Sequence, residues 1–281
     1  MAETGRERLA TMFAMARQEN RAALLPYLTA GIPSPDESVR IFKAMADAGA
    51  DGFEVGIPYA DPLMDGPVIM GAGELALERG VTVSVALDVV RRVSQETGKP
   101  VLAMTYVNPV LRRGIDAFFA DAADAGAAGV IIADLPSDEA EPFLAAAAKA
   151  GIGMALFIAP TTDDVRLRAV LDAEPTFVYA VAEVGVTGER DTASSNTESL
   201  ATRIREHSDV PIVFGVGISG PDQAASASEH GDGVIVGTAI VRRVVGVDAL
   251  DGAAKADAIS DLAGFVGELA RAVRSETVQE I

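Results

Sequence analysis

Acidic side chains in an apolar setting are the first feature of this sequence that suggests chemistry. Glu54 lies inside an otherwise apolar stretch, GFEVGI at 52–57, and Asp61 and Asp65 follow it within eleven residues. Two carboxyl groups in different environments are able to divide acid–base and electrostatic roles between them. Asp before Pro or Gly is also common in ordinary turns, which is the simpler interpretation of Asp61 and Asp65.

The alternation of side chains along the same stretch indicates which way Glu54 points. In an extended strand, Phe53 and Val55 lie on one face, and Glu54 and Gly56 lie on the other. The larger apolar pair suits packing against helices, so Glu54 is predicted to face the enclosed side of the sheet. Burial there would raise its pKa toward a value useful for proton transfer. The alternative, an outward Glu54 paired with a helix cation, is disfavoured by this alternation.

Glycine-rich segments later in the chain predict a site for a phosphate group. Gly217 and Gly237 end two β-rich stretches, and Thr238 opens the helical segment TAIVRRV at 238–244. Glycine lets backbone N–H groups approach an anion closely, and a helix N-terminus favours negative charge. Gly188, within GVTG, is a further candidate for this cradle. The alternative is that these glycines only form tight turns.

Other cofactor chemistries are disfavoured by the sequence. Gly215, Gly217 and Gly220 match G-x-G-x-x-G, but they lie in the seventh repeating unit rather than the first unit of a dinucleotide-binding sheet. The chain has no cysteine, which excludes disulfides, thiolate zinc sites and iron–sulfur clusters. His207 and His230 lie at the ends of predicted outer helices, away from the carboxylates. We therefore expect no metal site.

Strand-like and helix-like segments alternate along the whole chain. The β-rich stretches lie at 22–30, 52–57, 100–106, 129–135, 153–159, 176–182, 211–217 and 233–237. Eight such units with helices between them predict a TIM (β/α)8 barrel in one domain spanning residues 1–281. An extra helix at 7–20 precedes the first strand, and a short phosphate-binding helix follows the last. A doubly wound open sheet is the alternative, although it rarely contains eight units.

In such a barrel the functional side chains lie at the carboxyl ends of the strands. This places Tyr27, Met104 and Tyr106 at the mouth, where they can line an apolar pocket; for Met104, simple packing is the alternative. The polar segment 183–197, which follows the sixth strand and contains GVTG, is predicted to be a loop that closes over the site.

Composition limits which classes of partner and which cellular location are expected. The chain has 281 residues, with 41 Asp and Glu against 23 Lys and Arg, a net charge of −18. Such a surface repels nucleic acid and anionic membranes. The start, MAETGRERLA, lacks the apolar core of a signal peptide, and the longest apolar run is broken by Lys149, so we expect a cytoplasmic protein. The acidic excess with only four lysines suggests adaptation to high salt.

A set of ordered motifs resembles the tryptophan synthase alpha chain family. The motifs are PYLTAG, FEVGIPYADPLMDGP, TYVNPVLRRG, GVIIADLP, GVTG, FGVGIS and VGTAIV, in the family's order, and the resemblance runs from about residue 10 to about residue 270. The string E-x-G-x-P-x-x-D-P-x-x-D-G-P is the specific part, because glycine loops alone suit many phosphate-binding barrels.

The resemblance implies retro-aldol cleavage of indole-3-glycerol phosphate to indole and glyceraldehyde 3-phosphate. It implies that Glu54 performs the acid–base chemistry, that Asp65 binds the indole N–H, and that Tyr179 positions Glu54. Thr187 would lie in a lid over Asp65. The phosphate would be held by Gly188, Gly217, Gly237 and Thr238, and the indole by Tyr27, Met104 and Tyr106.

The resemblance also implies a partner. The alpha chain of the family needs no cofactor itself and docks on a beta chain that holds pyridoxal phosphate. The two kinds of chain form an α2β2 tetramer, inside which indole passes from the alpha chain to the beta chain. The docking face would include the ADPLMDG loop and the ADLPSD loop with Asp134. Two rival functions are another phosphate-sugar barrel of the same pathway and a catalytically weak subunit that only activates its beta chain.

Four positions depart from the family pattern. Ile32 stands where Asp is frequent, Met70 where Gln is usual, and Ala182 and Glu183 where Ser and often a basic residue precede GVTG. Thr238 replaces a common Ser conservatively. Glu183 near a phosphate is unfavourable unless its side chain points away.

Overall fold

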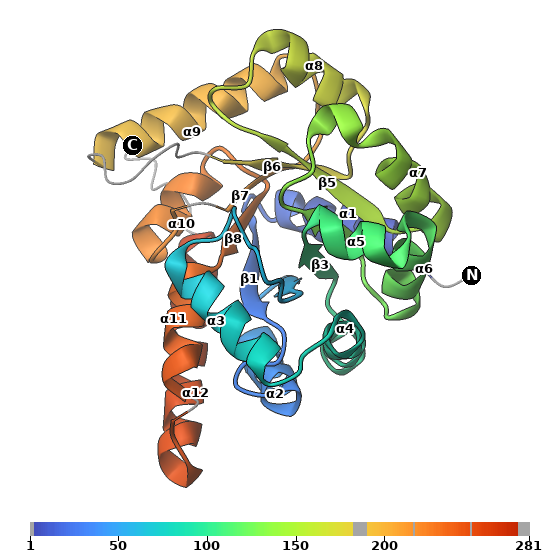
Figure 1. Ribbon diagram of the computed structural model, residues 1–281. Coiled ribbons are helices and arrows are strands. Elements are labelled where there is room, and N and C mark those ends of the chain that lie inside the picture. The colour runs from blue at the N-terminus through green and yellow to red at the C-terminus, as the bar shows by residue number, and fades with distance from the viewer. Residues whose placement is uncertain (1–2, 182–189, 216, 248, 275–281) are drawn as a thin grey trace, which may run out of the picture.

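Eight parallel strands form a closed barrel in which each strand pairs with the next along the chain and the eighth pairs with the first (Figure 1). The computed structural model describes residues 3–181, 190–215, 217–247 and 249–274. The strands are β1 Ala23–Thr29, β2 Phe53–Gly56, β3 Val101–Thr105, β4 Gly129–Ile132, β5 Gly153–Ile158, β6 Phe177–Ala180, β7 Ile212–Phe214 and β8 Gly233–Val236. The predicted (β/α)8 barrel is confirmed, and the alternative of an open doubly wound sheet is wrong.

Helices surround the barrel and cover the outer faces of its strands (Figure 1). They are α1 Gly5–Gln18, α2 Pro35–Asp47, α3 Pro67–Glu78, α4 Val83–Thr97, α5 Val107–Arg113, α6 Ile115–Asp124, α7 Glu141–Ala150, α8 Asp164–Asp172, α9 Arg190–Arg205, α10 Pro221–Ser228, α11 Thr238–Val247 and α12 Gly252–Ala272, with a 3-10 turn η1 at Ser137–Glu139. None of the helices within the described ranges is long and apolar enough to cross a membrane.

Local sequence signals set the ends of several helices. The side chains of Ser34, Thr82 and Asp163 accept backbone N–H groups at the starts of α2, α4 and α8. Gly98 and Gly151 end α4 and α7 with positive φ angles of 66° and 70°, which glycine adopts without strain. These caps explain why the alternation of strands and helices was visible in the sequence.

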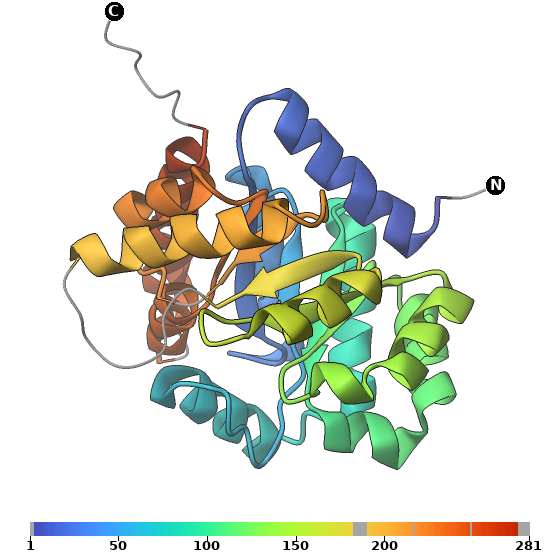
Figure 2. The same cartoon turned by 90° about the horizontal axis from the view of Figure 1, so that it is seen from above.

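The extra N-terminal helix covers one end of the barrel. In Figure 2, α1 lies across the strands apart from the ring of outer helices. Its buried face, which includes Leu9, Met12 and Phe13, packs near β1, β4 and β5. Gly5 and the capping box between Thr4 and Glu7 hold its start against the barrel. The end closed by α1 is the amino-terminal end of the strands, so the opposite end is the one open to ligands.

The register of the strands determines which side chains fill the barrel. Tyr27 on β1, Glu54 on β2 and Leu102 on β3 lie side by side, and Gly56 pairs with Met104 one layer further along. A Cβ atom added to Gly56 would come within 2.1 Å of the Tyr27 hydroxyl, so Tyr27 and Gly56 occupy the same side of the sheet. Glu54 shares that side and is only 3% exposed. The prediction that Glu54 faces the interior is confirmed.

One loop prediction needs correction. Residues 190–197 belong to α9 rather than to a loop, because this stretch lacks Gly and Pro and continues the helical pattern of LATRIREHS without a break. The rest of the predicted lid, including Thr187 and Gly188 and the departures Ala182 and Glu183, lies outside the described residues.

Candidate active site

Glu54 is a buried carboxyl group in the mouth of the barrel. Its Oε2 atom has no hydrogen-bond partner, alone among the buried side-chain oxygens and nitrogens of the described residues. Burial, and secondarily the charge of Asp65, raises the pKa of Glu54 to about 8. Glu54 therefore carries a proton at neutral pH, and that proton can be given to a bound molecule.

Asp65 stands at the entrance to the same cavity, directly before the start of α3. Its backbone N–H donates to Pro62 O over 3.0 Å, which folds the loop back toward the barrel. Burial raises the pKa of Asp65 to about 6, and a hydrogen bond from Tyr106 opposes this rise. At neutral pH Asp65 is ionised while Glu54 is protonated, so the two carboxyl groups already differ in charge.

Two buried tyrosines stand beside Glu54. Burial, followed by the nearby carboxylates, holds the pKa values of Tyr27 and Tyr179 well above 10. Each hydroxyl lies against a glycine, because a Cβ atom on Gly56 or Gly215 would come within 2.1 or 1.9 Å of it. Both tyrosines therefore remain neutral donors in fixed positions. Tyr179, which the resemblance assigns to positioning Glu54, is near enough to feel the charge of that carboxyl.

Tyr106 and Met104 lie on the opposite wall. Tyr106 is 2% exposed, and its hydroxyl accepts the Met64 N–H over 3.2 Å. Burial, and secondarily the charge of Asp65, raises the pKa of Tyr106 well above its usual value. Met104 is 8% exposed and lies in register with Gly56, facing the interior. Together with Tyr27, these side chains give the cavity an apolar wall suited to a flat ring.

The ends of β7 and β8 provide the glycine turns that were predicted to hold a phosphate. Gly217 has φ +86°, a conformation that L side chains rarely adopt. Gly237 precedes α11, and its carbonyl accepts the N–H groups of Ile240 and Val241. Thr238 is the exposed first residue of α11. An anion at this end of the barrel would meet the positive end of a helix dipole.

Three features of the site were not predicted from the sequence. Thr29 forms a 3.3 Å hydroxyl contact with Tyr27. Tyr59 packs against Tyr106. Asp134, which was expected only on a docking face, accepts the Val107 N–H over 2.7 Å and so fixes the start of α5. A Pro before Tyr59 marks a turn, but contacts of this kind depend on loop geometry that sequence patterns do not carry.

The described residues contain no group of three or more His, Asp and Glu side chains placed to hold a metal ion. The acids of the mouth are Glu54, Asp65 and Asp61, and Asp61 is exposed.

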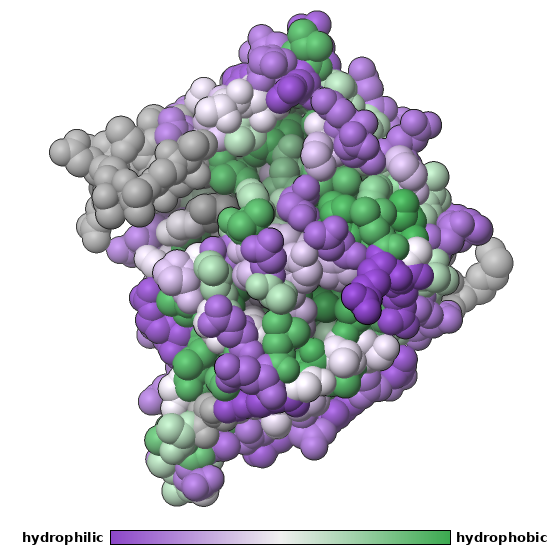
Figure 3. Space-filling view, viewed as in Figure 1, coloured by the Kyte–Doolittle hydropathy of each residue, from purple (hydrophilic) through white to green (hydrophobic). Residues whose placement is uncertain are grey.

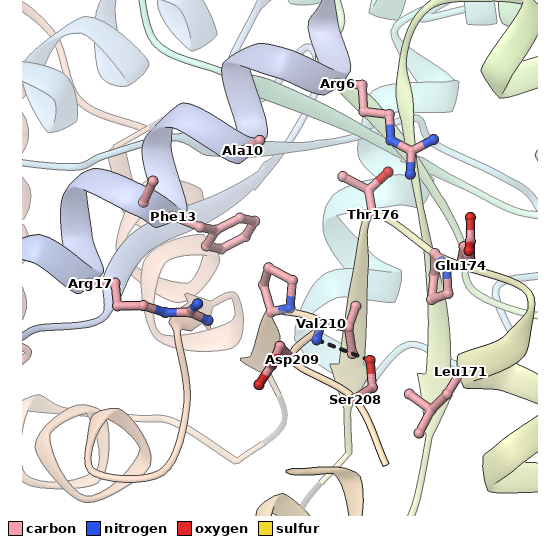
Figure 4. A pocket seen from close by; sticks show the side chains of 13 residues that line it. Arg6, Ala10, Phe13, Arg17, Leu171, Glu174, Thr176, Ser208, Asp209 and Val210 are labelled. Carbon is pink, nitrogen blue, oxygen red and sulfur yellow. Dashed lines mark hydrogen bonds between the residues drawn. The ribbon is translucent and has the colours of Figure 1, made fainter.

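A separate cavity of about 520 Å³ lies at the other end of the barrel (Figure 4). It is formed between α1 and the loops that lead into β6 and β7, and its lining includes Arg6, Phe13, Arg17 and Glu174. Because ligands of this fold bind at the carboxyl ends of the strands, this cavity is not part of the candidate active site.

Comparison with known proteins decides the family. A family model described as Tryptophan synthase alpha chain matches residues 13–274. The chain belongs to the tryptophan synthase alpha chain family.

Relatives of this family match over nearly the whole chain. The tryptophan synthase alpha chain of Streptomyces avermitilis is 42% identical over 266 residues, covering 95% of this chain and 94% of the relative. That of Thermobifida fusca is 43% identical over 265 residues, covering 93% and 96%. A chain of Mycobacterium tuberculosis tryptophan synthase superposes with a TM-score of 0.85 at 40% identity, covering 96% of this chain and 99% of that one. The resemblance noted in the sequence is confirmed.

Proposed function

We propose that this chain is the alpha subunit of a tryptophan synthase, a lyase that cleaves indole-3-glycerol phosphate to indole and glyceraldehyde 3-phosphate and passes indole to a beta subunit. The observation that carries the catalytic assignment is the buried, unpartnered carboxyl of Glu54 beside Asp65. The pKa values of about 8 and about 6 leave one group protonated and the other ionised at neutral pH.

The first step uses this difference in protonation. The carboxyl of Glu54 transfers its proton to C3 of the indole ring, and the ring becomes a cationic indoleninium. Asp65, as a carboxylate, accepts the hydrogen bond of the ring N–H and stabilises the positive charge as it develops. The interaction is stronger in the transition state than with the neutral ring, so it accelerates the reaction.

The second step returns the proton. Glu54, now a carboxylate, takes the proton from the C3′ hydroxyl of the glycerol chain. The electrons of that O–H bond form the aldehyde C=O, the C3–C3′ bond breaks, and its electrons restore the neutral indole. Glu54 ends protonated, as it began. Tyr179, held neutral against Gly215, supports the carboxyl through this change of charge.

The remaining predicted site residues would bind the two ends of the substrate. Gly217, Gly237 and Thr238 would hold the phosphate at the ends of β7 and β8, with Gly188 completing the cradle and Thr187 closing over Asp65. Tyr27, Met104 and Tyr106 would enclose the indole ring. Binding both ends holds the reacting carbon near Glu54, which lowers the entropic part of the barrier.

The partner is a tryptophan synthase beta chain, and we propose an α2β2 tetramer. Leu63, Met64 and Leu111 are 80%, 64% and 52% exposed beside the mouth, and apolar side chains are visible among hydrophilic ones on the face in Figure 3. Exposed apolar side chains of this size are typical of protein contacts. This supports docking through the ADPLMDG loop, with Asp134 nearby. The alpha chain needs no cofactor; pyridoxal phosphate belongs to the beta chain.

The composition supports a proposal about salt. The acidic surface, with a net charge of −18, suits a cytoplasm of high salt content. Added KCl should therefore raise the stability of the purified chain, and equal stability without salt would contradict this. We also propose that residues 1–281 act as a single domain.

The decisive experiment measures free indole released from indole-3-glycerol phosphate, with and without a beta chain. Wild type should release indole, and Asp65→Asn should lose about 10²-fold in kcat while its circular dichroism spectrum is unchanged. Asp257→Asn, at an exposed position on α12, is the matched control and should match wild type. Release by neither form of the protein would favour another phosphate-sugar barrel, and release only with the beta chain would favour a subunit that is weak alone.

A further inference from the structure

Tyr59 lies just outside the pair of acids Glu54 and Asp65, and the side chain of Tyr106 links it to them. Its ring packs against that of Tyr106, with ring centroids 5.2 Å apart and an interplanar angle of 31°. Its hydroxyl accepts a hydrogen bond from the Asn108 amide over 2.8 Å. Tyr59 is half-buried, and with Asn108 it lines an open cavity of about 770 Å³ beside the barrel mouth. The ring of Tyr59 is therefore held at both its face and its edge.

Tyr106 in turn is fixed at three points. Its hydroxyl accepts the Met64 N–H over 3.2 Å, which ties it to the residue directly before Asp65. It also lies near enough to the Asp65 carboxyl to lower the pKa of that group. The next residue, Val107, is fixed through its N–H by Asp134, and the Tyr106 ring packs against Tyr59. A tilt of this ring would move the hydroxyl away from the Met64–Asp65 segment.

We propose that Tyr59 is a positioning residue for the cleavage reaction: it holds the Tyr106 hydroxyl against the Met64–Asp65 segment, while Asn108 anchors Tyr59. This inference rests on the proposed function, since it gives Asp65 the role described above.

The consequence for catalysis follows from the direction of the hydrogen bond. A hydroxyl that donates to a carboxylate stabilises its ionised form. Without it, burial and the neighbouring Glu54 act unopposed, and more of Asp65 is protonated at neutral pH. A protonated Asp65 does not stabilise the cationic ring. Tyr27 and Tyr179, the other titratable groups near the two carboxyls, remain neutral throughout.

The test replaces Tyr59 without opening the site to water. Tyr59→Leu keeps an apolar side chain but removes the flat ring, and Tyr59→Phe keeps the ring but removes the contact with Asn108. We expect Tyr59→Leu to lower kcat about tenfold, to change KM less than twofold, and to shift the acid limb of the pH profile upward. Tyr59→Phe should lose less than threefold. Arg112→Ala, an exposed residue of the same cavity, is the matched control and should match wild type.

A double-mutant cycle separates positioning from a general loss of structure. If Tyr59 acts through the Tyr106 hydroxyl, then Tyr59→Leu should cost less than twofold when added to Tyr106→Phe, which has already lost that hydroxyl. Losses that multiply, or an acid limb that stays in place, would overturn the inference. If wild type releases no indole, the proposed function fails by itself. An NMR titration of the Asp65 carboxyl then decides the inference: a raised pKa in Tyr59→Leu supports it, and an unchanged pKa refutes it.

Discussion

Replacing Glu54 with Gln should abolish activity and at the same time stabilise the protein, increasingly so as the pH rises. Wild-type Glu54 is buried without a partner for Oε2, and its pKa is about 8 in the folded state against 4.5 for an exposed glutamate. The folded state therefore binds this proton more tightly than the unfolded state does. For an acid with a raised pKa, folding stability is highest below the unfolded pKa and falls as the pH rises toward the folded pKa.

The magnitude follows from this difference. Between pH 4.5 and pH 8, each pH unit removes at most about 1.4 kcal/mol of stability through Glu54. From pH 5 to pH 8 the upper bound is about 4 kcal/mol, which for a chain of 281 residues corresponds to about 7 °C in Tm. Gln has the same shape and does not ionise, so Glu54→Gln escapes this penalty. It loses acid–base catalysis, a factor of at least ~10² in kcat.

The assay is thermal unfolding of wild type and Glu54→Gln at pH 5, 6, 7 and 8, with indole release measured on the same samples. The two Tm values should be close at pH 5 and diverge by several degrees at pH 8. The exposed Glu96→Gln is the matched control, and its Tm should follow wild type at every pH. A Tm difference that does not grow with pH would show that Glu54 is ionised when the site is empty, and the proton-donor role in the first step would be refuted. Substantial turnover by Glu54→Gln would remove Glu54 from the mechanism altogether.

Three further outcomes test other parts of the site. The pH profile of kcat/KM for wild type should be bell-shaped, with limbs near pH 6 and pH 8, because Asp65 must be ionised and Glu54 protonated when substrate binds; activity that still rises above pH 9 would contradict this order. Gly237→Ala should fold normally, since the added Cβ meets Ile69 at an ordinary 3.4 Å, but should raise KM about tenfold by crowding the phosphate; unchanged inhibition by glycerol phosphate would place the phosphate elsewhere. Asp232→Ala should lose about 1–2 kcal/mol of stability in urea with kcat/KM unchanged, because it removes the acceptor of the Ile212 N–H and the partner of the partly exposed Arg17 and Arg205; an unchanged urea midpoint would mean that this cluster is not a stabilising one.

The barrel was predictable because its signals are local and repeated. Each strand is a short apolar run bounded by Gly or Pro, and each strand found in the structure falls within the range expected from the sequence. The interior position of Glu54 followed from alternation alone, since a strand's side chains must point to opposite faces. Such signals depend only on residues that are close in sequence, so they can be recognised without knowledge of the tertiary contacts.

What could not be predicted depends on residues that meet only in the folded chain. Residues 190–197 are rich in Ser, Thr and Asn and suggest a loop, yet they continue α9, because they contain no Gly or Pro that would end the helix of the residues that follow. The packing of Tyr59 on Tyr106 brings together two loops that are 47 residues apart. The residue types suggested that Tyr106 forms part of the pocket wall. They did not show that the ring of Tyr59 supports Tyr106 and its hydroxyl.

Asp51 and Glu54 show how position on one strand decides what an acid does. Asp51 comes just before β2, at the end of the barrel away from the site, and it accepts two hydrogen bonds from Arg21 and one from the Leu24 N–H. Glu54, three residues further on, points into the barrel and leaves Oε2 without a partner. Asp232, before β8, repeats the first pattern with Arg17, Arg205 and the Ile212 N–H.

The two ends of the barrel therefore have opposite electrostatic designs. At the amino-terminal end, acids are matched by arginines and backbone donors, which stabilises the strands where they enter the barrel. At the carboxyl end, a buried acid is left unmatched, which costs stability and keeps its proton available for transfer. An arginine brought near Glu54 would lower its pKa and stabilise the fold, but it would also remove the proton on which the first step depends. The unpaired state of Glu54 is thus the feature that catalysis requires. The ion pairs of Asp51 and Asp232 at the amino-terminal end supply stability that compensates for the buried, unpaired carboxyl.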